Sequence, residues 1–224
     1  MSLPVDKAFC INLDRRPEKW HRTRELLSGV GIFVERWPAC DGGSRFVTEA
    51  HTAIGTQYIK RVGALGCLMS HHALILHAKH AGYKRIAVFE DDVLPALDFD
   101  YDKISQLPPW QFVYLGATQW DWDVEIKNGY YHPHRTLGTW AMMIDCSLYD
   151  AILTAYEQLN LTADMALSTI LTDHPKAFVL SPGLFISDLT ISDIRPWPAG
   201  GGFPEMYHWN PQCYASQKYS TESG

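Results

Sequence analysis

The sequence has no excess of basic residues. It carries 19 Lys and Arg against 25 Asp and Glu, a formal net charge of -6 over 224 residues. Binding to a nucleic-acid backbone depends on clustered positive charge, so this balance argues against nucleic-acid partners. With 46% hydrophobic and 20% charged residues, the composition is that of an ordinary globular protein.

The sequence also lacks paired cysteines and long apolar runs. Its five cysteines are scattered and form no C-x-x-C pair. This is typical of reduced, mostly buried thiols and predicts neither a zinc site nor a disulfide framework. The chain starts with no apolar leader, and no run approaches the roughly 20 apolar residues of a membrane span. We therefore expect a cytoplasmic protein without a transmembrane segment.

One stretch combines an apolar run with a cluster of acids. Residues 85–89 are typical of a short buried strand, and Glu90, Asp91 and Asp92 follow directly. Adjacent carboxylates repel one another, and no Lys or Arg follows before Lys103. A divalent cation bound by carboxylate oxygens, with a phosphate completing its coordination, would relieve that repulsion. The alternative is an acidic turn exposed to solvent.

A pair of arginines follows the first predicted strand. Residues 8–13 are apolar enough for a buried strand, and Pro17 is suited to the first turn of a helix that ends near Gly29 or Gly31. Arg15 and Arg16 lie at this strand-to-helix turn. If the strands are parallel, they share a sheet edge with the acids, where guanidinium groups can grip phosphate or carboxylate. The alternative is a pair of ordinary surface arginines.

Further along, the pattern predicts a second strand over 32–37, a turn at 41–43 and a long helix from Gly63 to about Gly82. Residues 44–61 have weak periodicity and are interpreted as a mobile segment over the site. In the long helix, His71 falls within the apolar stripe. It is either a core histidine or, with Ser70, a donor to a ligand near the helix start.

Several motifs together resemble glycosyltransferase family 25, which includes lipooligosaccharide and procollagen galactosyltransferases. The motifs are Ile11-Asn12-Leu13-Asp14-Arg15-Arg16, Ala39-Cys40-Asp41-Gly42, Gly66-Cys67-Leu68-Met69-Ser70-His71, Phe89-Glu90-Asp91-Asp92-Val93, Thr162-Ala163-Asp164 and Ser192-Asp193-Ile194-Arg195. The resemblance covers residues 8–195. It implies an α/β GT-A fold, with a mostly parallel mixed sheet flanked by helices. It also implies a UDP-sugar donor, most simply UDP-galactose, a glycan acceptor such as lipooligosaccharide, and Mn²⁺ or Mg²⁺.

These motifs give each candidate residue a role. We expect Asp92, together with Glu90, to hold the metal ion, because residues two apart in an extended chain point the same way. Asp91 points the other way and is expected at the ribose or sugar as part of the catalytic centre. The candidate donor-binding residues are Asn12, Leu13, Arg15, Arg16, Asp41, Gly66, Ser70, His71 and Asp193.

The second candidate catalytic residue is Asp164. In the inverting reaction that the resemblance implies, a carboxylate takes the proton of the acceptor hydroxyl as that oxygen attacks the anomeric carbon. Asp164 matches the family pattern, but an acid beside Thr162 at a helix start also has a purely electrostatic role. Asp188 and Asp193 are the alternatives.

Aromatic residues suggest where an acceptor would bind. Trp120 and Trp122 alternate with acids, which suits stacking on a sugar face, but a half-buried strand shows the same alternation. We expect one catalytic domain over 1–195, and residues 196–224 to form an aromatic, glycine- and proline-rich flap and polar tail of that domain. A lipid-linked acceptor would bring the protein to the inner face of the membrane. The alternative function is a silent nucleotide- or carbohydrate-binding module.

Overall fold

The computed structural model describes residues 2–55, 57–96, 99–120, 125–127, 129–181, 183–188 and 193–194. Trp122 and the expected C-terminal flap lie outside these ranges. The helices and strands are β1 (Lys7–Asn12), α1 (Pro17–Gly29), β2 (Glu35–Pro38), α2 (Arg45–Ile54), α3 (Val62–His80), β3 (Arg85–Glu90), β4 (Val93–Pro95), α4 (Asp102–Ser105), β5 (Phe112–Gln119), β6 (Glu125–Lys127), β7 (Tyr130–Tyr131), β8 (Thr136–Asp145), a 3-10 turn (Cys146–Leu148), α5 (Tyr149–Glu157), α6 (Ala163–Leu171), β9 (Ala177–Leu180) and β10 (Phe185–Ser187).

The centre of the protein is an eight-stranded mixed sheet in the order β2-β1-β3-β8-β5-β9-β7-β6. Within it, β7 and β8 run against the direction that the other strands share. A second, two-stranded sheet pairs β10 with β4. The predicted α/β architecture, with helices flanking a mixed sheet, is confirmed.

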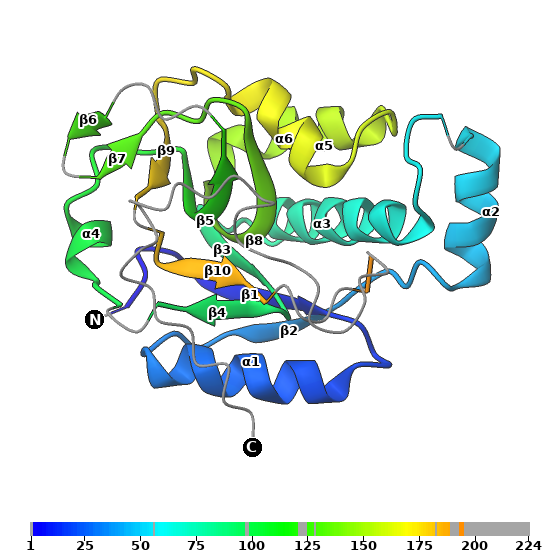
Figure 1. The fold of residues 1–224 in the computed structure, drawn as a ribbon, viewed down its shortest axis with the longest axis horizontal. Coiled ribbons are helices and arrows are strands. Elements are labelled where there is room, and N and C mark those ends of the chain that lie inside the picture. Colours follow the sequence, from blue (N-terminus) through cyan, green and yellow to red (C-terminus); the bar gives the residue numbers. More distant parts are fainter. Residues whose placement is uncertain are drawn as a thin grey trace.

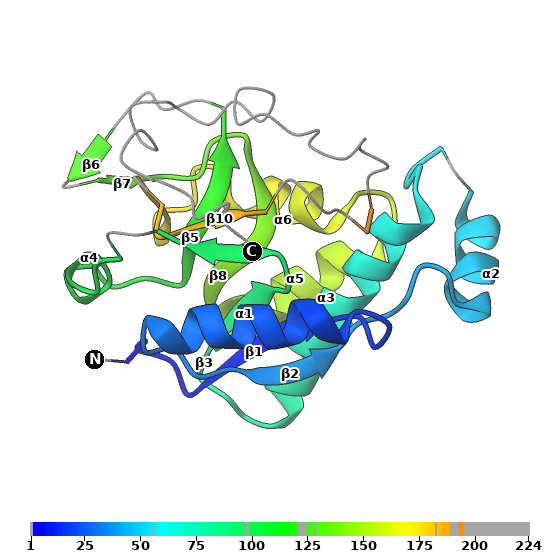
Figure 2. The ribbon, with the colours of Figure 1, turned by 60° about the horizontal axis from the view of Figure 1, so that its bottom comes forward.

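Helices cover both faces of the sheet. Helix α1 packs on one face beside β4, and α3, α5 and α6 pack on the other (Figures 1 and 2). Strand alternation explains why both faces are apolar. Phe9 and Val88 belong to the core under α3 and α5, whereas Cys10 and Phe89, the next residues along each strand, belong to the core under α1.

Helices α1 and α3 match their predicted positions. Pro17 begins α1, where its missing N–H costs nothing, and Gly31 follows the helix with φ of +76°. The expectation for residues 44–61 is wrong in part, because residues 45–54 form α2. Ser44 caps this helix by accepting a hydrogen bond from the Val47 amide. Val47, Ala50 and Ile54, which recur at helical spacing, face the core.

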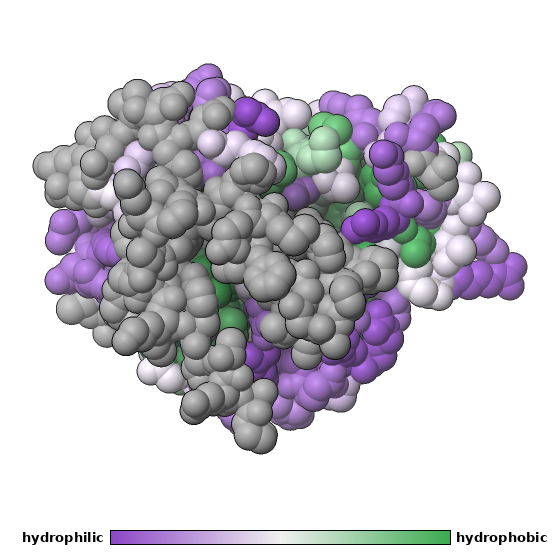
Figure 3. Space-filling view, viewed as in Figure 1, coloured by the Kyte–Doolittle hydropathy of each residue, from purple (hydrophilic) through white to green (hydrophobic). Residues whose placement is uncertain are grey.

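The surface is hydrophilic where α1 faces solvent, along the lower edge of the view in Figure 3. Its inward stripe consists of Lys19, Thr23 and Leu27, four residues apart. Two of these three buried residues are polar, which is unusual for a core-facing stripe and points to a polar site beneath the first turns of α1. Among the described helices, none combines the length and apolar character needed to cross a bilayer.

Gly116 in β5 lets the small sheet approach the large one. A Cβ atom at this position would lie 2.0 Å from the carbonyl oxygen of Phe185 in β10 and 2.7 Å from Nε1 of Trp140. The Leu184 amide also donates to the Leu115 carbonyl at 2.7 Å. Because Gly116 has no side chain, β10 can pack directly against β5. Its partner strand β4 is held in place with it.

We expect Gly116→Ala to lower the free energy of unfolding by about 3 kcal/mol, the upper part of the usual range for overpacking, because backbone must move to admit the methyl group. Gly29→Ala is the matched control. A Cβ there meets nothing within 4 Å, and alanine is expected to stabilise the helix by about 0.5–1 kcal/mol. Urea denaturation of both variants measures the difference, and equal stabilities would contradict the close approach.

Candidate functional site

The site lies where β1 and β3 end. These strands are parallel neighbours, and Ile11 is paired with Glu90. Asn12 at the end of β1 and Glu90 at the end of β3 therefore reach the same edge of the sheet, as predicted from the sequence. Asp91 and Asp92 form the turn between β3 and β4. Because the strand stops at Glu90, strand alternation does not set the directions of the three acids.

A pocket of about 170 Å³ opens at this edge. Of the predicted site residues, it brings together Asn12, Leu13, Arg15, Asp41, Ser70, His71, Glu90, Asp91, Asp92 and Asp193. Arg16, Gly66, Asp164 and Trp120 are not among the described residues that line it. Lys19 and Cys67 also line the pocket, although sequence reasoning did not select them.

Glu90 points toward α3. Its Oε1 lies 2.9 Å from Nε2 of His71, 3.8 Å from Sγ of Cys67, and accepts a hydrogen bond from the hydroxyl of Thr139. Burial by itself raises the pKa of Glu90, but the hydrogen bonds from His71 and Thr139 outweigh it and hold the pKa below its usual value. Glu90 is therefore ionised at neutral pH.

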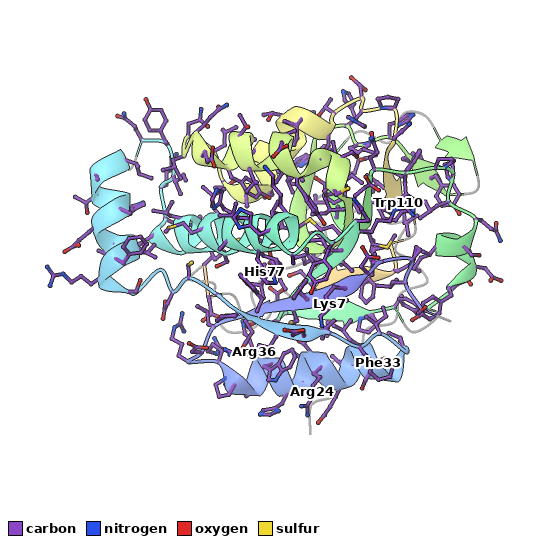
Figure 4. All side chains as sticks on the ribbon, turned by 180° about the vertical axis from the view of Figure 1, so that it is seen from behind. Lys7, Arg24, Phe33, Arg36, His77 and Trp110 are labelled. Atoms are coloured by element: carbon purple, nitrogen blue, oxygen red, sulfur yellow. The ribbon has the colours of Figure 1, made fainter. Side chains whose placement is uncertain are left out.

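Asp91 points toward α1. Its carboxylate accepts a hydrogen bond from the Asn12 side-chain amide at 2.6 Å, and Nζ of Lys19 lies 3.8 Å from its other oxygen. The Asn12 side chain is itself fixed, since it also donates to the Arg16 carbonyl and accepts from Arg36, which projects from β2 (Figure 4). Asn12 therefore positions Asp91, and its amide is fully used by the protein.

Asp92 is the acid with the least compensation. Oδ2 accepts a hydrogen bond from the Ser187 hydroxyl at 3.1 Å. Oδ1 is buried and has no hydrogen-bond partner among the described residues. Burial, together with the charges of Glu90 and Asp91, raises the pKa of Asp92 to about 8. A buried carboxylate oxygen without a donor, beside two further acids, is suited to a bound cation.

Three cations gather around Asp193, beside the acids. Arg15, Arg16 and Lys19 donate to the carboxylate of Asp193 at 2.9, 2.7 and 2.7 Å. Burial raises the pKa of Asp193, but the three donors, led by Lys19, outweigh it and lower that pKa. We call Arg15, Arg16 and Lys19 the cation cluster. It binds a carboxylate and has the charge and donors to bind phosphate oxygens.

Ser70, Asp41 and Gly66 shape the wall formed by residues 39–43. The Ser70 hydroxyl accepts from the Cys40 amide at 2.8 Å and donates to the Gly66 carbonyl at 2.7 Å. A Cβ on Gly66 would lie 2.5 Å from the Cys40 carbonyl oxygen, so glycine allows this turn to pack on α3. Asp41 accepts from Arg15 at 3.0 Å. Ser70 and Gly66 thus support the pocket from behind.

The remaining predicted residues lie elsewhere. Asp164 lies in the first turn of α6, where it accepts hydrogen bonds from the Thr162 hydroxyl and the Met165 amide at 2.5 and 2.9 Å. Trp120 is 37% exposed and lies under the Arg135 guanidinium, 5.5 Å from its ring centre. No contact in the described structure tests the catalytic role of Asp164 or the acceptor role of Trp120, so both stay predictions.

The sequence contained signals for the two residues that we missed. Cys67 precedes His71 by four residues, which places both on one face of α3. Lys19 lies on the buried stripe of α1 and its side chain is 8% exposed. The arginine pair at the strand-to-helix turn is the stronger local signal in this segment.

Sequence comparison finds relatives over part of the chain. A glycosyltransferase 25 family member of Drosophila melanogaster is 29% identical over 102 residues, 41% of this chain and 16% of that protein. One from Aedes aegypti is 25% identical over 138 residues, 54% of this chain and 23% of that protein. A probable inactive glycosyltransferase 25 family member 3 of Rattus norvegicus is 28% identical over 131 residues, 51% and 23% of the two chains.

These relatives confirm the predicted resemblance to glycosyltransferase family 25, although the chain spans less than a quarter of their length. No family model matches the chain. A crystal structure of a glycosyltransferase involved in the glycosylation of the major capsid of PBCV-1 aligns with a TM-score of 0.49 and 9% identity, over 83% of this chain and 93% of that one. A197 from STIV aligns with a TM-score of 0.38 and 13% identity, over 80% and 82%. Neither score informs function.

Proposed function

We propose that this chain, a relative of the glycosyltransferase 25 proteins, transfers a sugar from a nucleoside diphosphate to a hydroxyl of a glycan. The observation that carries the proposal is the pairing of two opposite sites in one pocket. Asp92 offers a buried oxygen without a donor, and Arg15 and Lys19 of the cation cluster line the same pocket. A diphosphate with its divalent counter-ion fits both sites, because the ion can bind the acids and the phosphate oxygens can bind the cations.

The acids fit a hard divalent ion. Asp92, with Glu90 beside it, would hold Mn²⁺ or Mg²⁺ through carboxylate oxygens, the ligands that these ions prefer. Such an ion, when bound, stabilises the charge that develops on the departing diphosphate. The protein's own residues would bind and orient the donor. Asn12 orients Asp91 toward the donor, and the cation cluster holds phosphate oxygens.

Asp193 has a specific part in this proposal. Its carboxylate takes four hydrogen bonds from the cation cluster, which donor phosphates would share or replace. The same three cations lower the pKa of Asp193, which makes it a poor base. Asp188 is tied to Arg22 at 2.6 Å. Asp164 therefore remains the preferred general base for the acceptor hydroxyl.

We expect Asp164→Asn to spare donor binding and to reduce turnover by roughly 10²–10⁴-fold, the usual contribution of a general base. The test compares the rate of transfer with the affinity for the nucleoside diphosphate. Asp173→Asn, a change in the loop after α6, is the control. If Asp164→Asn turns over as fast as the control, Asp164 is not a catalytic residue and its role is to stabilise the start of α6.

The donor is tested by thermal shift and product release. UDP- and GDP-sugars are screened with Mn²⁺, with UDP-galactose as the expected stabiliser, and glycan-dependent release of the diphosphate is then measured. Stabilisation by no nucleotide sugar, with any divalent ion, would refute the proposal.

A silent binding module is the second candidate, because one relative is described as a probable inactive family member. A module would bind the nucleoside diphosphate but never release it from a nucleotide sugar, with any metal ion or acceptor. The cation cluster and the acids are consistent with binding in either case, so the release assay separates the two.

A further inference from the structure

The floor of the pocket carries a second group of possible metal ligands. Sγ of Cys67, a ring nitrogen of His71 and a carboxylate oxygen of Glu90 all lie within 4.8 Å of one another. The first two come from successive turns of α3 and the third from the end of β3. All three residues line the pocket, so an ion can reach them and one coordination position can stay open to a water molecule.

The geometry of this group is close to that of a tetrahedral site. With the usual zinc–ligand bond lengths, neighbouring ligand atoms lie about 3.3–3.8 Å apart. The distance from Glu90 Oε1 is 2.9 Å to His71 Nε2 and 3.8 Å to Cys67 Sγ. Small side-chain rotations would bring the three atoms to their usual bonding distances from a central ion.

The supporting contacts also suit a ligand set. Thr139 donates to the same oxygen of Glu90, which fixes the carboxylate as outer partners fix metal ligands. His71 is 1% exposed, and its other ring nitrogen has no hydrogen-bond partner among the described residues. Among the described residues, Glu90 is therefore the hydrogen-bond partner of the His71 ring.

We propose that Cys67, His71 and Glu90 form a binding site for Zn²⁺ or a similar thiophilic divalent ion, distinct from the hard-ion site at Asp92. Thiolate, imidazole and carboxylate together select zinc or cobalt over magnesium and manganese. Binding releases the thiol proton to solvent and breaks the hydrogen bond from His71 to Glu90, so that Nε2 of a neutral imidazole is free of its proton and the ring carries its proton on Nδ1. The thiolate and the Glu90 carboxylate then balance the two positive charges of the ion, so the metal-bound site has no net charge.

Glu90 belongs to both sites, which gives the proposal a functional consequence. A zinc ion held by Cys67 and His71 takes a Glu90 oxygen from the hard-ion site. Zn²⁺ is therefore an antagonist of Mn²⁺ in this pocket, and removal of the Cys67 sulfur should relieve that antagonism. The zinc site itself does not depend on whether the chain transfers sugars.

Cobalt spectroscopy on the full chain tests the site directly. Co²⁺ is titrated into metal-free protein, and we expect thiolate-to-cobalt charge-transfer absorption that saturates near one equivalent and disappears when Zn²⁺ is added. Cys67→Ser should lose this absorption. Cys146→Ser, which changes a partly exposed thiol remote from the group, should keep it, and so should Asp92→Asn.

Absence of the absorption from the wild-type protein would overturn the proposal, and so would equal absorption in Cys67→Ser. If Cys67→Ser does not fold, the zinc site is tested instead by alkylation of the cysteines in the wild-type protein. Zn²⁺ should slow modification of Cys67 at least tenfold without slowing that of Cys146, as measured by peptide mass spectrometry. Equal rates would reject the site. A wild-type protein that shows Mn²⁺-dependent transfer but no cobalt signal rejects this site alone. A wild-type protein that shows the cobalt signal but no transfer rejects only the proposed function.

Discussion

Asp92→Asn is expected to abolish transfer while leaving the metal-free protein at least as stable as the wild type. Transfer should fall by at least roughly a hundredfold, because charge stabilisation by a bound divalent ion is worth several kcal/mol. Stability should not fall, because asparagine removes a carboxylate whose Oδ1 is buried without a donor. A structural acid would show the opposite pair of results.

The pH dependence of this stability difference has a definite sign. The pKa of Asp92 is raised to about 8 in the folded, metal-free protein, against about 3.9 for an unfolded aspartate. Between these values the folded state keeps a proton that the unfolded state has lost, so the wild type loses stability as pH rises. The advantage of Asp92→Asn should therefore grow from about pH 4 to pH 8 and then level off.

Chemical denaturation without metal ions, repeated across this range, measures the difference. Mn²⁺ should reverse it, because the ion stabilises the wild type by binding the folded state and has lost a ligand in the variant. Asp102→Asn, which changes an exposed acid in α4, is the control and should follow the wild type. A pH-independent destabilisation by Asp92→Asn would contradict the cation site.

Lys19→Met is expected to have the largest effect on stability of any change in the cation cluster. Nζ of Lys19 lies 2.7 Å from Asp193 and 3.8 Å from Asp91, and its side chain is 8% exposed. Removing one partner of a buried ion pair costs about 3–5 kcal/mol. We expect the lower part of that range, because Arg15 and Arg16 still contact Asp193. Affinity for UDP should fall by roughly tenfold or more, since one charged hydrogen bond contributes about 1.5–3 kcal/mol.

Lys79→Met is the matched control for this experiment. Lys79 pairs with Asp150 on the surface, where its side chain is 45% exposed, and such pairs contribute at most about 1 kcal/mol. Equal denaturation midpoints for Lys19→Met and Lys79→Met would show that Lys19 is not a buried partner of the acids.

The sequence was sufficient to locate the pocket because its two main motifs each follow a strand. The apolar runs before Arg15 and before Glu90 identify buried strands, and parallel pairing then brings their ends together. The directions of the acids could not be predicted. They depend on where β3 stops, and one residue decides whether Asp91 lies in a strand or in a turn.

The features that could not be predicted from the sequence depend mostly on contacts between residues far apart in the chain. Asp193 is 174 residues from Lys19 in the chain, and no local pattern pairs them. The scattered cysteines, with no C-x-x-C pair, predict a buried thiol at Cys67 and no zinc site. The structure places it beside a carboxylate from another element. Helix α2 was missed although Val47, Ala50 and Ile54 recur at helical spacing and pack on the core, because this apolar stripe spans only two turns.

The position of β8 has a consequence for synthesis of the chain. This strand lies between β3 and β5 and pairs with both, yet it is made after them. Until Asp145 has left the ribosome, β3 and β5 have no strand to join them, and each presents unpaired backbone to its surroundings. A nascent chain that stops at residue 135 should therefore be protease-sensitive and bound by chaperones, whereas one that has exposed residue 181 can close the central sheet.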